Sequence, residues 1–166
     1  EDQTRLICAK FSDLSIINTY IPQGRSIDHI MYKYKLGWYK RLKNLFQKEF
    51  NNTESVAWIG DMNIAPTPLD VSNYKTKKND PCYHEFARDA FLNVCEFGFD
   101  DLLRKLHPDE QIYSFFDYRV KDAVLKNIGW LTLILMGNVV KFVHYVEVMF
   151  VNIAIKNYGY NLYIKL

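Results

Sequence analysis

Two polar residues, Asp61 and Asn63, stand two positions apart, directly after the apolar run Val56–Ile59 and a glycine. Because alternate residues of an extended strand point to the same side, we expect the carboxylate and the carboxamide to converge at the mouth of a sheet. Such a pair can bind a divalent cation through oxygen ligands, and the carboxylate can orient or deprotonate a water for attack on phosphorus. The same spacing also fits an Asx-turn in which Asn63 caps its own backbone.

Two further segments carry groups suited to a phosphodiester. Tyr20 ends the segment LSIINTY, where its hydroxyl can hydrogen-bond a phosphate or simply project into water. Residues 114–119, SFFDYR, place Phe116 near Arg119, so that a ring can stack on a base while the guanidinium binds a phosphate. The plainer alternative for this second segment is an aromatic strand with a solvated arginine.

The spacing of apolar residues predicts the scaffold that positions these groups. Strands are expected over Arg5–Lys10, Leu14–Tyr20, Ser55–Ile59 and Ile112–Tyr118, the first two as a hairpin. Helices are expected from Ile27 to Phe46, over His84–Phe97 with Gly98 as C-cap, and as a short turn over Asp100–Leu106. The lysines of the first helix, Lys35 among them, fall off its apolar stripe, and Thr67–Pro81 is expected as a long surface loop. This order of elements predicts an α/β layered domain.

The composition is that of a globular domain. The 166 residues are 49% hydrophobic and 24% charged, which is enough for a sizeable core, and the net charge of +2 gives no argument for a polyanionic partner by itself. Cys8, Cys82 and Cys95 are scattered, which predicts free thiols and a cytoplasmic location. His84 and His107 have no partner at metal-ligand spacing and are expected as surface or capping residues.

Four segments taken together resemble the exodeoxyribonuclease III family of the endonuclease/exonuclease/phosphatase superfamily. They are INTYIPQG, WIGDMNIAPTPLD, EFGFDDLLRKLHPDEQIYSFFDYR and NIGW, and they occur in the family's order between about Arg5 and Trp130. The resemblance implies a four-layer α/β sandwich, in which two packed sheets are flanked by helices. It also implies cleavage of double-stranded DNA at abasic sites and trimming of 3′ ends with Mg²⁺ or Mn²⁺.

The resemblance assigns roles to residues that match the family's motifs. Tyr20 is similar to a tyrosine that contacts the scissile phosphate, and Asp61 to the aspartate that activates the attacking water. Asn63 is similar to the asparagine that positions this aspartate and the phosphate, and Asp61 and Asn63 are the metal ligands that the resemblance leaves in this sequence. Phe116 and Trp130 resemble aromatic residues near the pocket for the extruded abasic sugar, and Arg119 is expected near the DNA backbone.

The resemblance ends near Trp130, where the composition also changes. The family's Asn-x-Asn and Gln-Glu-x-Lys elements, the second with its metal-binding glutamate, have no counterpart here, and neither has its Ser-Asp-His element. Residues 131–166 contain no Asp and a single histidine, His144. We therefore expect a family-like domain over residues 1–130 and a diverged apolar tail over residues 131–166, for which a shifted reading frame is one hypothesis.

Three functions follow as hypotheses. The first is a DNA-repair nuclease whose activity is impaired by the missing motifs. The second is a truncated, non-catalytic relic that binds DNA weakly at most. The third is a membrane-associated or interaction protein defined by the apolar tail. Lys141, His144 and Glu147 in the middle of that tail argue against a membrane span, because charged groups are costly in lipid.

Overall fold

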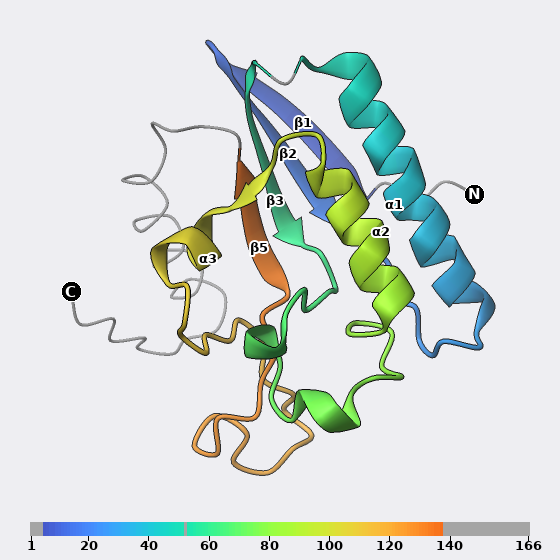
Figure 1. Cartoon of the computed structure of the whole chain (residues 1–166), viewed down its shortest axis with the longest axis vertical. Helices are drawn as coiled ribbons and strands as arrows, with labels where there is room; N and C mark the ends of the chain where they lie inside the picture. Colours follow the sequence, from blue (N-terminus) through green and yellow to red (C-terminus); the bar gives the residue numbers. More distant parts are fainter. Residues whose placement is uncertain (1–4, 52, 138–166) are drawn as a thin grey trace.

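The computed structural model describes residues 5–51 and 53–137, which form a mixed α/β fold built on a five-stranded sheet (Figure 1). The strands are β1 (Leu6–Phe11), β2 (Leu14–Tyr20), β3 (Ser55–Asp61), β4 (Asp100–Asp101) and β5 (Leu133–Gly137), in the spatial order β1-β2-β3-β5-β4. The helices are α1 (Ile30–Glu49), α2 (Glu85–Cys95) and α3 (Leu102–Leu106), with short 3-10 helices at Pro68–Asp70 and Tyr74–Thr76.

The first three strands fix the position of the candidate site. β1 and β2 form the predicted antiparallel hairpin, whereas β2 and β3 pair in parallel. Parallel neighbours need a crossover connection, and α1 supplies it. Because parallel strands end at the same edge of the sheet, the register pairs Tyr20 at the end of β2 with Asp61 at the end of β3.

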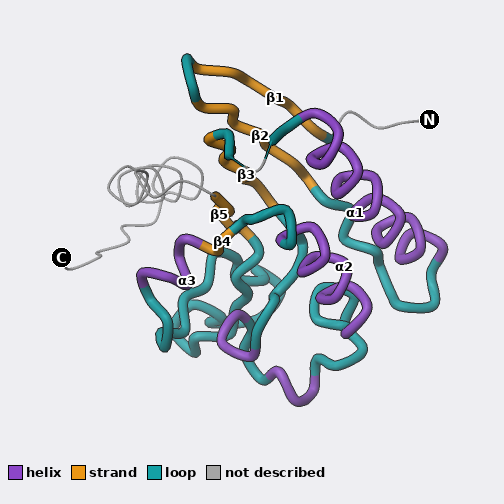
Figure 2. The backbone as a smooth tube through the Cα atoms, turned by 45° about the horizontal axis from the view of Figure 1, so that its top comes forward, coloured by secondary structure: helices purple, strands orange, loops and turns teal. Residues whose placement is uncertain are grey.

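Helices α1 and α2 lie over one face of the sheet (Figure 2), and an aromatic core joins them to it. Trp58 of β3 lies fully buried between Phe46 of α1 and Phe91 of α2, with ring centroids 5.6 Å away in both cases. Burying large aromatic side chains supplies much of the hydrophobic stabilisation of a small domain. This packing holds the sheet against α1. Side chains of the same helix also contact the chain that follows β3, at the candidate site.

The opposite face of the sheet has a smaller cover. Leu102 at the start of α3 and Ala57 of β3 form a second buried cluster, against which Ile16 packs. Towards the edge of the sheet, Ile7 and Phe11 of β1 are 70% and 60% exposed. The described residues therefore cover this face only near β3 and α3.

Three predicted elements differ from the structure. The helical turn expected over residues 100–106 begins with the two-residue strand β4, and only the residues of α3 are helical. Residues 112–118 are not a strand: Phe115 makes a single antiparallel bridge to Trp130, and the surrounding chain is a loop. Residues 67–81 are not uniformly a surface loop, because Asp70 and Val71 are buried. The aromatic residues of segment 112–118 predicted a strand, but only Phe115 pairs with another segment, because no neighbouring strand extends the pairing.

β5 lies beyond the predicted boundary at residue 130. It pairs with both β3 and β4 in the middle of the sheet, so the described chain continues as one sheet across that position. Residues 138–166, which include His144 and most of the predicted apolar tail, lie outside the described residues. Within the described part of the chain, no helix has the length and apolar character needed to cross a membrane.

Candidate active site

The predicted site residues of β2 and β3 lie side by side. Tyr20 is 53% exposed at the end of β2, and the Arg5 guanidinium lies 4.9 Å from the centre of its ring. Its partner in the register is Asp61, the last residue of β3. The register thus places a tyrosine and an aspartate opposite each other at one edge of the sheet.

Asp61 and Asn63 converge, although the chain is not extended between them as predicted. Asn63 has a left-handed backbone with φ of 46°, and its amide N–H donates to Asp61 Oδ1 at 2.9 Å. The Asn63 carboxamide donates to Asp61 Oδ2 at 3.2 Å and to the Ile21 carbonyl at 2.9 Å. The alternative Asx-turn is therefore present, but Asp61 rather than Asn63 accepts the turn hydrogen bond.

Asp61 lies in an environment that suits proton transfer. Burial raises the pKa of its carboxyl, while hydrogen bonds from Asn63 and from the Thr132 side chain and the charge of Lys35 act in the opposite direction. A carboxylate whose pKa moves towards the working pH becomes a better general base. The hydrogen bonds from Asn63 also fix its orientation.

Gly60 lets β3 approach β2 closely just before Asp61. Its φ is +120°, and a Cβ atom there would lie 2.1 Å from the Thr19 carbonyl oxygen and 2.5 Å from Asn18 Oδ1. Only glycine tolerates both the backbone conformation and this contact. The close pairing of β2 and β3 at the strand end therefore requires glycine at position 60, directly before Asp61.

We expect Gly60→Ala to lower the free energy of unfolding by about 2–3 kcal/mol, because the added methyl group must push β2 and β3 apart. Urea unfolding followed by circular dichroism measures this loss. The matched control is Gly37→Ala in α1, where the nearest atom to an added Cβ is the flexible end of Arg41 at 3.7 Å. Equal stability of the two variants would contradict the close approach at Gly60.

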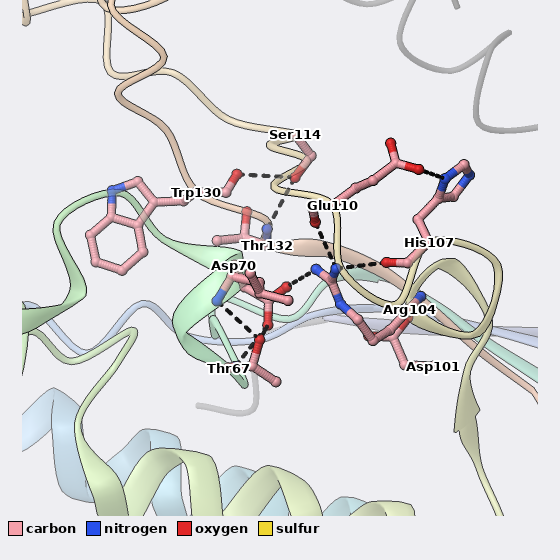
Figure 3. Close-up of polar contacts among 10 residues, drawn as sticks. Thr67, Asp70, Asp101, Arg104, His107, Glu110, Ser114, Trp130 and Thr132 are labelled. Atoms are coloured by element: carbon pink, nitrogen blue, oxygen red, sulfur yellow. Dashed lines mark hydrogen bonds and ion pairs between the residues drawn. The ribbon is translucent and has the colours of Figure 1, made fainter.

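A buried ion pair fixes the segment that follows the site turn (Figure 3). Asp70 is 1% exposed and pairs with Arg104 of α3. The same carboxylate accepts hydrogen bonds from the backbone N–H and hydroxyl of Thr67 at 2.7 and 2.6 Å, completing a capping box. Arg104 in turn donates to the carbonyls of His107 and Glu110 at 2.8 and 2.7 Å.

This network also holds Trp130 beside the loop that carries Phe116. The Asp70 carbonyl accepts from the Leu131 amide at 2.7 Å, and Trp130 bridges both Val71 and Phe115. Two residues further on, the Thr132 carbonyl accepts from the Met62 amide at 2.8 Å, next to Asp61. The structure therefore brings the aromatic residues Phe115, Phe116 and Trp130 to the side of the candidate site.

Basic groups lie on the same loops. Lys77 Nζ lies 5.2 Å from the centre of the Trp130 ring, at cation–π distance. Arg119 is exposed, and its guanidinium binds both carboxylate oxygens of Asp117, with Nη2 at 2.7 Å from Oδ2. This contact lowers the pKa of Asp117 to about 2. Any phosphate that binds Arg119 must compete with Asp117.

We expect the Asp117 carboxyl to titrate at about pH 2 and to return towards its ordinary range in Arg119→Gln. Because the folded pKa is lowered, the contact is present at neutral pH and is lost as the pH falls through about 2. NMR titration of the carboxyl carbon measures the change, with Arg119→Lys as the comparison that keeps the charge but not the two-point contact. An unchanged Asp117 pKa in Arg119→Gln would contradict the pairing.

Sequence reasoning missed or misplaced several residues of the site. Lys35 was expected on the solvent face of its helix, but it is fully buried and donates to three backbone carbonyls. Asp70 stood in a recognisable Thr-x-x-Asp capping pattern, which was a signal for its buried role. The prediction of capping positions for His84 and His107 is confirmed, because His84 is the N-cap of α2 and His107 the C-cap of α3. Their side chains also have partners: Tyr32 Oη lies 2.8 Å from His84 Nδ1, and His107 Nδ1 lies 2.8 Å from Glu110.

The described residues offer a small donor set for a divalent cation. Asp61 provides a carboxylate, whereas the Asn63 carboxamide oxygen lies 3.8 Å from the buried Cys82 thiol. Between residues 5 and 137, outside the undescribed residue 52, no group of three or more His, Cys, Asp or Glu side chains is arranged to hold a metal. Mg²⁺ usually retains several waters and needs only one or two protein carboxylates, so Asp61 fits one part of such a site.

Comparison with known proteins places this fold among the AP endonucleases. An AP endonuclease structure from Archaeoglobus fulgidus superposes with a TM-score of 0.79 at 46% identity, over 81% of this chain and 52% of that one. The DNA-(apurinic or apyrimidinic site) endonuclease of Dictyostelium discoideum is 31% identical over 133 residues, which are 78% of this chain and 36% of that protein. The exodeoxyribonuclease III of Haemophilus influenzae is 31% identical over 131 residues, 72% of this chain and 49% of that protein.

The fold is thus that of a mixed α/β domain of the AP endonuclease type. The chain belongs to the exodeoxyribonuclease III and AP endonuclease family, as its motifs predicted. It spans about half or less of the length of these relatives. No family model matches the sequence.

Proposed function

We propose that this chain forms part of a DNA-repair nuclease that hydrolyses phosphodiester bonds at abasic sites and at DNA 3′ ends. The observation that carries the proposal is the Asp61 carboxylate, fixed by two hydrogen bonds from Asn63 beside the exposed Tyr20. Asp61 orients and deprotonates the attacking water, Asn63 positions Asp61, and Tyr20 donates to a phosphate oxygen. A bound Mg²⁺ or Mn²⁺ supplies stabilisation of charge on the phosphate.

The DNA-binding part of the proposal rests on the loops beside this site. Trp130 and Phe116 offer ring faces to an extruded sugar or an unstacked base, and Lys77 and Arg119 offer cations to the backbone. The partner is double-stranded DNA with abasic sites or 3′ ends. The three free thiols of Cys8, Cys82 and Cys95 support a cytoplasmic location for the protein.

The small metal-ligand set supports a further part of the proposal. Because Asp61 does not belong to a group of three or more His, Cys, Asp or Glu side chains that could hold a metal among the described residues, we propose that hydrolysis by this chain alone is slow. The partly uncovered face of the sheet around Ile7 and Phe11 supports a four-layer sandwich as the complete fold, in which a second sheet packs on this face. The same small ligand set favours, as a second candidate, a non-catalytic protein that binds DNA weakly.

A nicking assay separates the two candidates. Purified chain is incubated with a duplex that carries a single abasic site, with Mg²⁺ and with EDTA. We expect slow nicking that requires the metal and is lost in Asp61→Ala. Absence of nicking at high protein concentration, together with retained binding to the same duplex, would support the non-catalytic candidate instead.

A further inference from the structure

A lysine ammonium lies in the protein interior directly behind the candidate site. Lys35 extends from α1 and is 0% exposed. Its Nζ donates to the carbonyls of Asn63 and Pro81, both at 2.7 Å, and to the carbonyl of Gln23 at 3.2 Å. The proposed function uses none of these contacts.

The geometry indicates that this nitrogen is charged. Three carbonyl oxygens lie within hydrogen-bond distance of Nζ, which matches the three N–H donors of an ammonium, whereas a neutral amine has only two; the Cys82 Sγ atom, 4.0 Å from Nζ, is a fourth and weaker partner. None of the ion pairs between residues 5 and 137 includes Lys35. Burial lowers the pKa of Lys35, and the nearby Cys82, Asp80 and Asp61 act in the opposite direction. A buried cation is costly unless it is fully hydrogen-bonded, and backbone carbonyls provide the three shortest of its hydrogen bonds here.

The three carbonyls belong to three different segments that border the site. Gln23 follows β2 and Tyr20, Asn63 follows β3 and Asp61, and Pro81 precedes α2. One helical turn after Lys35, the Tyr39 hydroxyl donates to the Met62 carbonyl at 2.6 Å. Residues four apart lie on one face of a helix, so α1 fixes two consecutive carbonyls of the site turn.

Asn63 needs this support because of its own conformation. Its φ of 46° is a left-handed backbone that a residue other than glycine adopts only at a cost. In that conformation its amide and carboxamide nitrogens both donate to Asp61. The Met62 carbonyl, which Tyr39 holds, lies in the same planar peptide as the Asn63 N–H, and the Asn63 carbonyl, which Lys35 holds, fixes the ψ angle of Asn63. Together these contacts keep both Asn63 donors aimed at the carboxylate.

We propose that Lys35 is a positioning residue of this site: its ammonium clamps the Asn63 turn to the segments after β2 and before α2, and so fixes the Asp61–Asn63 pair. The effect on hydrolysis rests on the proposed function, whereas the clamp itself does not. The clamp is therefore tested by measurements that need no activity.

The first measurement uses the unaltered chain. Nitrogen-15 NMR of lysine side chains is expected to show one slowly exchanging ammonium at neutral pH, connected to the Lys35 side-chain carbons. Exposed lysines such as Lys33 exchange with water too fast to give such a signal. Absence of a protected Lys35 ammonium would overturn the proposal without any variant.

The second measurement compares Lys35→Met with Lys43→Met. Lys43 lies on the same helix, and its contacts are at the surface: an ion pair with Glu96 and a hydrogen bond to the Asn93 carboxamide oxygen at 3.4 Å. In Lys35→Met, we expect hydrogen exchange of the Asn63 carboxamide to accelerate by about tenfold or more, because the turn opens locally. The buried Trp58 Nε1–H, which donates to Thr19 Oγ1 at 2.8 Å, serves as the internal reference and should change far less. Lys43→Met should change neither.

The outcomes separate a clamp from a general loss of stability. Equal acceleration at Asn63 and Trp58 in Lys35→Met, or no acceleration at Asn63, overturns the clamp. Selective acceleration at Asn63 supports it, even if the chain nicks no DNA, in which case only the proposed function fails. Where nicking is measurable, the clamp predicts a lower kcat in Lys35→Met with little change in KM, since Lys35 is buried away from DNA.

Discussion

Asp61→Asn is expected to reduce metal-dependent nicking of an abasic-site duplex by about 10²–10⁴-fold, the usual range for loss of a positioned general base. The asparagine keeps an oxygen that can accept the Asn63 amide hydrogen bond, so the turn should persist. It cannot take a proton from water, and it contributes no charge to a divalent cation. Initial rates at saturating substrate, with and without Mg²⁺, measure the effect.

The same substitution is expected to affect stability in the opposite direction. Burial raises the pKa of the Asp61 carboxyl, so the folded state disfavours its ionised form at neutral pH, and a neutral amide removes this cost. In EDTA at pH 7, the free energy of unfolding of Asp61→Asn should equal or exceed that of the unaltered chain. As the pH falls from the folded pKa of Asp61 to the ordinary pKa of an aspartate, the folded state binds a proton before the unfolded state does, so the difference should shrink and then disappear.

The control for both effects is Asp13→Asn. Asp13 is exposed in the turn between β1 and β2, at the other end of these strands from Tyr20 and Asp61. It should alter neither nicking nor stability measurably. If Asp61→Asn nicks DNA as fast as Asp13→Asn, Asp61 is not the base and the proposed role is wrong.

The parts of the fold that the sequence predicted are those that local patterns determine. The apolar stripe from Ile27 to Phe46 located α1, and the turn at Ser12-Asp13 located the hairpin, because both depend on neighbours close in the chain. The insertion of β5 between β3 and β4 could not be predicted, since it joins residues more than 30 positions apart. A strand pattern says nothing about which distant strand completes the sheet.

The candidate site, like the fold, was predicted from the sequence only in part. The motif around Asp61 and Asn63 located the polar pair correctly, whereas its geometry required the positive φ of Asn63, which residue spacing does not show. Lys35 was misplaced because a helical stripe classifies lysine as polar, and only the tertiary contacts reveal three carbonyls that receive its ammonium. Buried polar residues are the positions where a hydrophobic pattern fails.

Asp70→Asn is expected to cost about 3–5 kcal/mol of unfolding free energy, because it leaves the Arg104 guanidinium without its buried partner. For a domain of this size, such a loss is a large part of the total stability. The amide can still accept from Thr67, so the capping box should persist in part, and the loss should come mainly from the unpaired charge. Chemical unfolding at neutral pH measures it.

Asp100→Asn provides the matched control, since Asp100 also pairs with a cation but does so at the surface. The side chains of Asp100 and Lys105 are both more than half exposed, and such pairs contribute at most about 1 kcal/mol. A double-mutant cycle with Arg104→Gln tests the mechanism, because removing both partners should restore part of the stability lost in Asp70→Asn. Equal losses in Asp70→Asn and Asp100→Asn would contradict a buried pair.

The Asp70→Asn substitution should also destabilise the segment around Trp130, which is proposed to contact DNA. The Leu131 amide donates to the Asp70 carbonyl, and Trp130 bridges Val71 and Phe115 on either side of it. When the Asp70 side chain no longer anchors α3, hydrogen exchange at the amides of Phe115, Trp130 and Leu131 should rise before that of Trp58 in the core. Because this segment carries the aromatic residues proposed to contact DNA, Asp70→Asn should weaken binding to an abasic duplex even under conditions where the sheet remains folded.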